Sequence, residues 1–208
     1  MSAGIVDHEA HTRDLRRLGG LMALMPVMGT LVLVAAAAMA GIAPLNGFIS
    51  KEMMLDEALH AGNRMWGSFG WLVPVLATAG GLFSAAYSIR LVHDAFFNGA
   101  PRDLAGVRPH EPAWGMKAPV VLLVAVCIAV GLMPFIAEPL VRVAGAAALG
   151  VPPPDFHLAL WHGVNAPLLM SMFGLLAGLT LYASLQRGGR LHRYLPSALA
   201  ADARAYVR

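Results

Sequence analysis

Four long stretches of the chain contain no aspartate, glutamate, lysine or arginine, and this pattern limits the possible folds more than any other feature. The stretches are Leu18 to Ser50, Met65 to Ile89, Ala118 to Ala137 and Gly163 to Gln186. Each is long enough to cross a hydrocarbon core about 30 Å thick, which takes roughly 20 apolar residues as a helix. None shows the alternating hydropathy of a membrane β-barrel strand. The sequence therefore predicts an all-α, polytopic membrane protein with about four spans.

The composition also indicates a membrane protein. The chain is 58% hydrophobic and 13% charged, whereas an ordinary soluble domain is about half apolar and about a quarter charged. Its net charge of +3 comes from thirteen arginines and two lysines against twelve acidic residues. Because the arginines lie mostly at the ends of the spans, they report topology, and no nucleic-acid partner is expected.

Charges between the spans predict the topology. The positive-inside rule places both termini and the 90–117 loop in the cytoplasm. We expect one membrane domain over 1–208, with a cytoplasmic amphipathic lead-in (1–20), a transmembrane region (21–186) and a cytoplasmic tail (187–208). The arginines that set this orientation are Arg13, Arg16, Arg17, Arg90, Arg102, Arg108, Arg187, Arg190 and Arg193.

The first span is too long for one straight helix, because its 33 residues would reach roughly 50 Å at 1.5 Å per residue. Pro44 removes a backbone donor and disfavours a helical conformation in the residue before it. We predict a helix over about 26–40, an irregular link, and a second helix over about 47–60. Gly47 follows the break, and Asn46 is a candidate cap for the second helix. Such discontinuous helices commonly build ion sites in transporters.

Lys51 directly follows the uncharged stretch. On a helix, its neighbours three and four residues away are apolar, and the adjacent Glu52 points about 100° away. Desolvation favours the neutral form of a lysine, so its proton could be lost and regained near neutral pH, as a proton relay requires. The alternative is a lysine at the outer interface that snorkels its amine into water. The depth of Lys51 in the membrane distinguishes these interpretations.

Two further sets of polar residues are candidates for a path. Glu52, Asp56 and His60 form an i, i+4, i+8 stripe, which is either a proton or ion path leading from Lys51 or the solvated face of a helix end. His93 and Asp94 follow the second span and are either a cytoplasmic proton entrance or a pair facing the loop.

Other site classes find no support in the sequence. The eight histidines lack the spacing of an HExxH or Cys/His metal site, and no Walker loop, dinucleotide turn or GxSxG elbow occurs. We therefore expect no metal, no cofactor and no enzymatic activity. The single cysteine, Cys127, is interpreted as a small packing residue. Residues 135–150, after Pro134, are either a kinked extension of the third span or an interfacial helix.

Three stretches resemble a known family. They are 8–21 (HEAHTRDLRRLGGL), 41–53 (GIAPLNGFISKEM) and 160–170 (LWHGVNAPLLM). The first two resemble the antiporter-like subunits shared by respiratory NADH:quinone oxidoreductase and the Mrp (Pha) cation/proton antiporters. The third is most similar to the A subunits of the Mrp antiporters, and the likeness extends over nearly the whole chain.

The resemblance implies a role for Lys51. In the family, the matching lysine sits on a broken transmembrane helix, at the outlet end of a hydrophilic axis that carries protons. It implies a multi-subunit antiporter of a bacterial inner membrane, exchanging Na⁺ or K⁺ for H⁺, with the other subunits and lipid as partners. Position 11 departs from the family, because His stands where Gly is expected. Family members are several times longer, so the chain is expected to be an internal segment that contributes only the outlet half of the path.

Two other functions remain open on sequence grounds. One is a segment of the proton-pumping subunit of respiratory NADH:quinone oxidoreductase. The other is a purely structural membrane segment in which Lys51 is an interfacial anchor.

Overall fold

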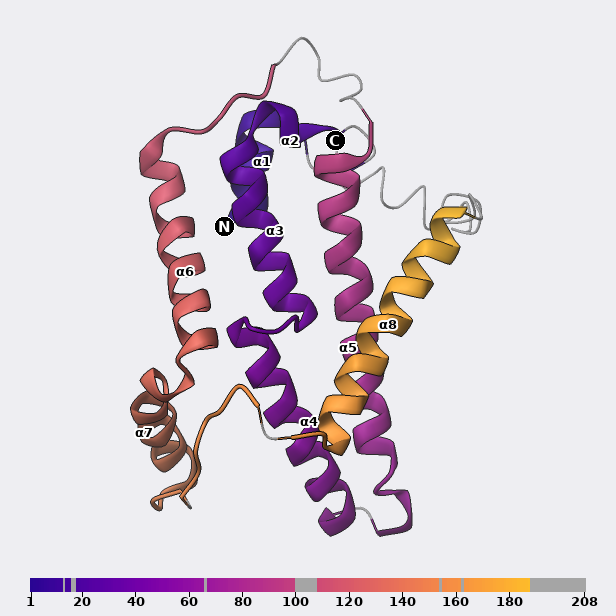
Figure 1. The fold of residues 1–208 in the computed structure, drawn as a ribbon, viewed down its shortest axis with the longest axis vertical. Coiled ribbons are helices and arrows are strands. Elements are labelled where there is room, and N and C mark those ends of the chain that lie inside the picture. The colour runs from indigo at the N-terminus through magenta and orange to yellow at the C-terminus, as the bar shows by residue number, and fades with distance from the viewer. Residues whose placement is uncertain are drawn as a thin grey trace.

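The computed structural model describes residues 1–12, 14–15, 18–65, 67–99, 108–153, 155–161 and 163–187. Within these ranges the chain is helical and forms no β-strand (Figure 1). Three helices are long and apolar enough to cross a membrane: α5 (Leu72–Val92) with its continuation η2 (His93–Phe97), α6 (Trp114–Leu132) and α8 (Ala166–Arg187). A further pass is divided between α3 (Pro26–Ala40) and α4 (Asn46–Met65). The predicted all-α polytopic fold is confirmed.

The helices alternate in direction, so the ends of the bundle differ (Figure 1). The helices α1 (Ser2–Ala10) and α2 (Leu21–Leu24) lie at the same end as the start of α6 and the C-terminal ends of α5 and α8. The opposite end holds the C-terminal end of α4 and the start of α8. This arrangement agrees with the predicted grouping of the lead-in and the 90–117 loop on one side. The tail 188–208 and the charges of Arg13, Arg16, Arg17 and Arg102 lie outside the described residues.

The broken first pass forms where the sequence predicts it. α3 begins at Pro26, whose missing N–H matches a helix start, and it ends at Ala40 before Gly41, which has φ +82°. The Ala43–Pro44 peptide bond in the link is cis. α4 begins at Asn46, one residue before the predicted start at Gly47, so Asn46 is its first residue and not a cap before it. The helix continues five residues beyond the predicted end at His60.

The second span is longer than predicted at its C-terminal end. It begins at Leu72, after the 3₁₀ turn η1 (Gly67–Phe69), and continues past Ile89 into the π-helical turn η2. Arg90 does not end the helix, because its Nε lies 3.4 Å from Asp94 Oδ2 one turn later and the two charges pair.

The close approach of α5 and α8 depends on small residues. A Cβ at Gly178 would lie 2.8 Å from the Ala85 Cβ, and one at Gly174 would lie 3.4 Å from the Thr78 carbonyl oxygen. Gly174 and Gly178 are four residues apart, the small-xxx-small spacing that lets membrane helices pack backbone to backbone. This packing brings the C-terminal ends of the two helices into contact.

Residues 135–150 do not continue the third span. α6 ends at Leu132, and a 3₁₀ turn, η3 (Pro134–Ile136), separates it from α7 (Glu138–Leu149). With 12 residues, α7 is shorter than the roughly 20 needed to cross a bilayer. None of its residues is buried, and an ion pair between Arg142 and Asp155 (3.1 Å) ties it to the following linker. α7 is therefore a separate helix at the end of the bundle, which fits the expected interfacial helix better than a kinked extension of the third span.

The turn after α1 adopts the conformation that suits glycine even though the residue is His11. This residue has φ 51° and ψ 30°, in the left-handed region. Histidine is among the non-glycine residues enriched in that region. The departure from the family pattern at position 11 therefore leaves the turn in place, at some cost in backbone strain.

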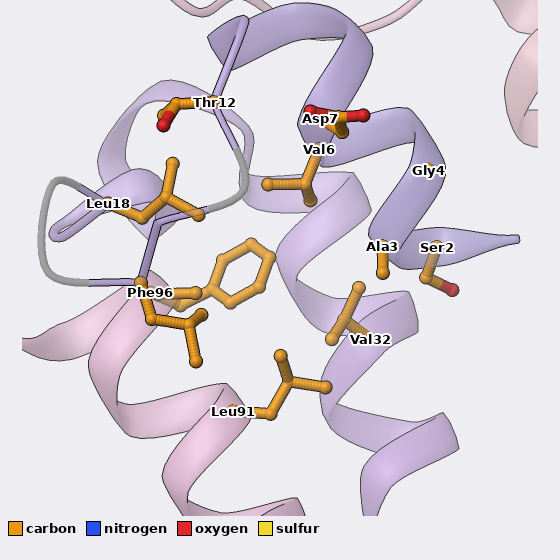
Figure 2. A pocket seen from close by; sticks show the side chains of 12 residues that line it. Ser2, Ala3, Gly4, Val6, Asp7, Thr12, Leu18, Val32, Leu91 and Phe96 are labelled. Atoms are coloured by element: carbon orange, nitrogen blue, oxygen red, sulfur yellow. The ribbon is translucent and has the colours of Figure 1, made fainter. Parts of the chain in front are cut away.

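An apolar cavity of about 440 Å³ lies between α1, α3 and the end of α5. Figure 2 shows Phe96 between Val6, Leu18, Val32 and Leu91 around this space. None of the predicted relay residues lines it. We interpret the cavity as packing space between the lead-in helix and the spans.

Candidate functional site

The centre of the candidate site is the contact between Lys51 and the end of α3. Lys51 lies in the second turn of α4, and its Nζ donates a hydrogen bond to the Ala40 carbonyl oxygen at 2.8 Å. Its aliphatic stem runs over Gly41, where a Cβ would lie 2.6 Å from Lys51 Cδ. Gly41 is thus required both for its positive φ and for this close approach. The lysine bridges the two halves of the broken helix.

The break exposes the last carbonyl groups of α3, and each of them has a donor. The Ile42 and Gly41 amides donate to the Ala37 and Ala38 oxygens, both at 3.0 Å. Ser84 Oγ of α5 donates to the Met39 oxygen at 2.9 Å, and Lys51 donates to the Ala40 oxygen. Unsatisfied backbone groups in a bilayer cost several kcal/mol. Two side chains, Ser84 and Lys51, therefore complete the end of α3, and Lys51 also places a positive charge at the negative end of the helix dipole.

The link between the two helices is held by close backbone contacts. A Cβ at Gly47 would overlap the Ala38 carbonyl oxygen, and a Cβ at Gly131 of α6 would overlap that of Pro44. The Asn46 side-chain oxygen accepts a hydrogen bond from the Cys127 thiol at 2.9 Å. Cys127 is therefore more than the packing residue that the sequence suggested, because it ties α6 to the start of α4.

Lys51 lies inside the bundle and away from its ends. A cavity of about 10 Å³ beside it is lined by three helices. Its lining residues are Lys51, Met54, Leu55, Ala77, Thr78, Gly81, Met170, Ser171 and Gly174. At 1.5 Å per residue, those from α5 and α8 lie about 6 to 14 Å inside the starts of their helices. A space of this size holds about one water molecule.

The predicted stripe of Glu52, Asp56 and His60 divides into two parts. Glu52 is 6% exposed, whereas the side chains of Asp56 and His60 are each 59% exposed. His60 Nδ1 lies 2.8 Å from the Asp56 carbonyl oxygen and 3.8 Å from Asp56 Oδ1. The structure brings Asp56 and His60 together, and Lys51 bonds to the Ala40 carbonyl, not to the stripe.

A residue that the sequence did not single out caps the start of α3. The carboxylate of Glu111 accepts hydrogen bonds from the Met28 amide (2.9 Å) and the Val27 amide (3.3 Å). Glu111 also lies 3.6 Å from Nζ of Lys117, the second lysine, which sits over the Trp114 ring. A carboxylate at this position satisfies free N–H groups and complements the helix dipole. The start of α3 is thereby fixed to the segment before α6.

A polar cluster joins the C-terminal ends of α5 and α8. The Tyr182 hydroxyl lies 2.8 Å from His93 Nδ1 and 3.0 Å from Asp94 Oδ1. Gln186 Nε2 donates to Asp94 Oδ1 at 3.0 Å and to the Tyr182 hydroxyl at 2.5 Å. With Arg90 on its other oxygen, the Asp94 carboxylate has several donors around it. His93 and Asp94 thus face α8, and the loop-facing alternative is wrong.

Sequence reasoning missed the partners of these residues. Ser84, Cys127, Glu111 and Tyr182 are the residues concerned. Their contacts span 45 to 89 residues along the chain. For Ser84, Cys127 and Tyr182 the available signal was a polar residue inside an apolar span, because such groups usually hydrogen bond within a bundle; Glu111 lies outside the spans and gave no such signal. Among the described residues, no group of three or more metal-binding side chains is found.

Comparison with known proteins identifies relatives. The family described as "NADH:quinone oxidoreductase/Mrp antiporter, TM" matches residues 1–77. A probable K⁺/H⁺ antiporter A/B subunit of Rhizobium meliloti (strain 1021) is 45% identical over 183 residues, covering 88% of this chain and 18% of that protein. The Na⁺/H⁺ antiporter A subunit of Bacillus subtilis (strain 168) is 35% identical over 211 residues, covering 96% of this chain and 26% of that protein.

The fold has a solved counterpart. A chain in the structure of the Mrp complex from Dietzia sp. DQ12-45-1b superposes with a TM-score of 0.73 and 30% sequence identity. The match covers 99% of this chain and 22% of that chain. The chain therefore spans about a fifth to a quarter of the length of the relatives it matches.

Proposed function

Because the chain belongs to the family of Mrp-type antiporter A subunits, we propose that it forms part of a multi-subunit antiporter that exchanges Na⁺ or K⁺ for H⁺. Within that assembly it contributes the outlet half of a proton or ion path. The observation that carries the proposal is the hydrogen bond from Lys51 Nζ to the Ala40 carbonyl at the helix break.

Lys51 acts in this proposal as a proton relay. In its charged form, the ammonium group is stabilised by the Ala40 carbonyl and by the negative end of the α3 dipole. In its neutral form, the amine avoids the cost of a charge inside the bundle. Since these two effects oppose each other, a small change in nearby charge or hydration can load or release the proton. The position of Lys51 inside the starts of α5 and α8 supports this role over that of an interfacial anchor.

Glu52, Asp56 and His60 form the proposed exit toward the end of α4. Glu52 is buried within the chain and lies next to Lys51 in sequence, whereas Asp56 and His60 are exposed and close to each other. A proton released near Lys51 would pass from the buried carboxylate to the exposed pair. Pro44, Asn46 and Gly47 carry no proton in this scheme, and they hold the break that positions Lys51.

The proposed partners follow from the relatives. The chain works with the remainder of its own subunit, the other antiporter subunits and membrane lipid, in the plasma membrane of a bacterium. It is a transporter segment and not an enzyme. The family that matches residues 1–77 also includes NADH:quinone oxidoreductase, but the Rhizobium, Bacillus and Dietzia proteins support the antiporter assignment.

Substitution of Lys51 tests the relay. Lys51→Ala, made in the full-length subunit of the assembled complex, should abolish cation-dependent proton movement in everted membrane vesicles, measured with a pH-sensitive dye. Glu57→Gln is the matched control, because Glu57 is an exposed charged residue on the same helix. Full antiport by Lys51→Ala in an assembled complex would leave Lys51 without a transport role.

The depth of Lys51 can be measured independently. A cysteine at position 51, in a Cys127→Ser background that keeps a donor for Asn46, should resist membrane-impermeant maleimide from both sides. A cysteine at the exposed position 57 should be labelled from one side. Labelling of position 51 at the rate of position 57 would support the interfacial anchor.

A further inference from the structure

A groove of about 240 Å³ connects the helix break to the polar cluster at the end of α5. It lies between α3 and α5, and its lining residues are Leu33, Ala36, Ala37, Ala40, Ile42, Ser88, Ile89, Val92, His93 and Phe97. Ala40 and Ile42 belong to the break, where Lys51 donates its hydrogen bond. His93 belongs to the cluster with Asp94 and Tyr182. The groove therefore ends at His93 on one side and, on the other, at Ala40, whose carbonyl oxygen accepts the hydrogen bond from Lys51.

Ser88 is the polar side chain between these two ends. It is 1% exposed, and its Oγ has no hydrogen-bonding partner among the described residues. A buried hydroxyl without a partner loses the hydrogen bonds that it makes to water in the unfolded chain, so a serine with no role would be disfavoured here. Apart from Ser88 and His93, the groove is lined by apolar side chains. Its volume is several times the roughly 30 Å³ that one water molecule occupies in the liquid.

The spacing along α5 suits a chain of hydrogen bonds. Ser84, Ser88 and His93 lie four and five residues apart, which corresponds to about 6 and 7.5 Å of helix rise. Ser84 bonds to the Met39 carbonyl at the break, one turn from Ser88. Each interval is too long for a direct hydrogen bond and short enough for one or two bridging water molecules. Because Ser88 Oγ exposes less than 1 Å², the Ser88 side chain must rotate toward the groove to take part in such a chain.

The cluster can move a proton without moving a heavy atom. The Tyr182 hydroxyl has one proton and two acceptors, His93 Nδ1 and Asp94 Oδ1, within 3.0 Å. When Asp94 is protonated, it can give its proton to the phenol oxygen while the phenol gives its own proton to His93 Nδ1. Asp94 is then a carboxylate, His93 an imidazolium, and the phenol is unchanged. His93 can release the proton from its other ring nitrogen, so the imidazole passes it on.

Among the described residues, the charged and titratable neighbours of the cluster are few. Arg90 and Gln186 bond to Asp94, and the segments α2 (Leu21–Leu24) and α3 contribute no titratable side chain. His93 begins the π-helical turn η2, and such turns occur frequently at functional sites.

We propose that the His93–Asp94–Tyr182 cluster exchanges protons with the water at its end of the bundle and passes them along the Ser88 groove to the helix break at Ala40 and Lys51. The predicted topology places this end in the cytoplasm. The inference rests on the proposed function and adds to it a second access route, opposite the exit at Asp56 and His60.

Ser88→Ala is the sharpest test, because it removes a hydroxyl that has no partner among the described residues. In the full-length subunit of the assembled complex, this variant should keep or raise the melting temperature while antiport falls at least tenfold. Ser184→Ala is the matched control, since that exposed hydroxyl bonds, among the described residues, to the Leu181 carbonyl within α8. Its antiport should match that of the parent complex.

Tyr182→Phe tests the cluster itself and keeps the packing of the ring. Antiport should fall at least tenfold, and Tyr87→Phe on the exposed face of α5 should remain active. His93→Gln removes the ring nitrogen beside the Tyr182 hydroxyl and should also lower antiport at least tenfold in everted vesicles. Parental rates for Ser88→Ala and Tyr182→Phe would overturn the route. If Lys51→Ala abolished antiport while these variants kept it, the proposed function would stand and only the route through the Ser88 groove would be lost.

Discussion

Gly131→Ala should destabilise the chain through the main chain of the helix break. The three atoms nearest to an added Cβ are the Pro44 carbonyl oxygen, the Leu45 carbonyl carbon and the Asn46 amide nitrogen, the last two at 2.8 Å. All three belong to the backbone, so no flexible side chain can turn away. Inserting one carbon into such a contact costs about 1 to 3 kcal/mol. The link, and the start of α4 that carries Lys51, would have to shift.

The matched variant is Gly115→Ala on the same helix, where an added Cβ has no atom within 4 Å. Alanine favours a helix over glycine by up to about 1 kcal/mol, so this change should be neutral or stabilising. At about 2 to 4 °C per kcal/mol for a chain of this size, Gly131→Ala should lower the melting temperature by about 2 to 12 °C. Thermal unfolding of both variants in detergent measures the difference. Equal melting temperatures for the two would refute the close approach of α6 to the link.

Two further changes should alter stability in a chosen direction. Glu111→Ala removes the acceptor for the Val27 and Met28 amides and should lower the free energy of unfolding by about 0.5 to 2 kcal/mol, measured in detergent; no loss would mean that the cap is dispensable. His11→Gly should raise the free energy of unfolding by about 1 kcal/mol, because glycine adopts φ 51° without strain, whereas His8→Gly inside α1 should lower it by a similar amount. If His11→Gly destabilised the chain as much as His8→Gly, the turn would not carry the strain assigned to it.

The helices could be predicted where a local pattern defines them. Pro26 and Gly41 bracket α3, and the prediction of 26–40 was correct because a proline start and a glycine end act on the residues beside them. The end of the second span was placed too early at Ile89, because an arginine in sequence does not reveal that Asp94 will neutralise it one turn later.

The contacts that define the site depend on packing and not on local pattern. Ser84 reaches Met39, Glu111 reaches Met28 and Cys127 reaches Asn46 only because α3, α5 and α6 pack together. Sequence periodicity indicates which face of a helix is apolar, but these nearly uniform spans have no distinct polar face from which an arrangement could be inferred. Lys51 was identified from its isolation in sequence. Its acceptor, the Ala40 carbonyl oxygen, was not, because any residue at position 40 supplies the same backbone group.

The acceptor of Lys51 has a property that no side chain could give it. A main-chain oxygen is present whichever amino acid occupies position 40, and it neither titrates nor changes its formal charge. Replacement of Ala40 by another residue therefore cannot delete this half of the contact. Only a change in the path of the chain can move it. Mutations can therefore disrupt this bond only by altering Lys51 itself or the backbone conformation of residues 41–47 and their neighbours.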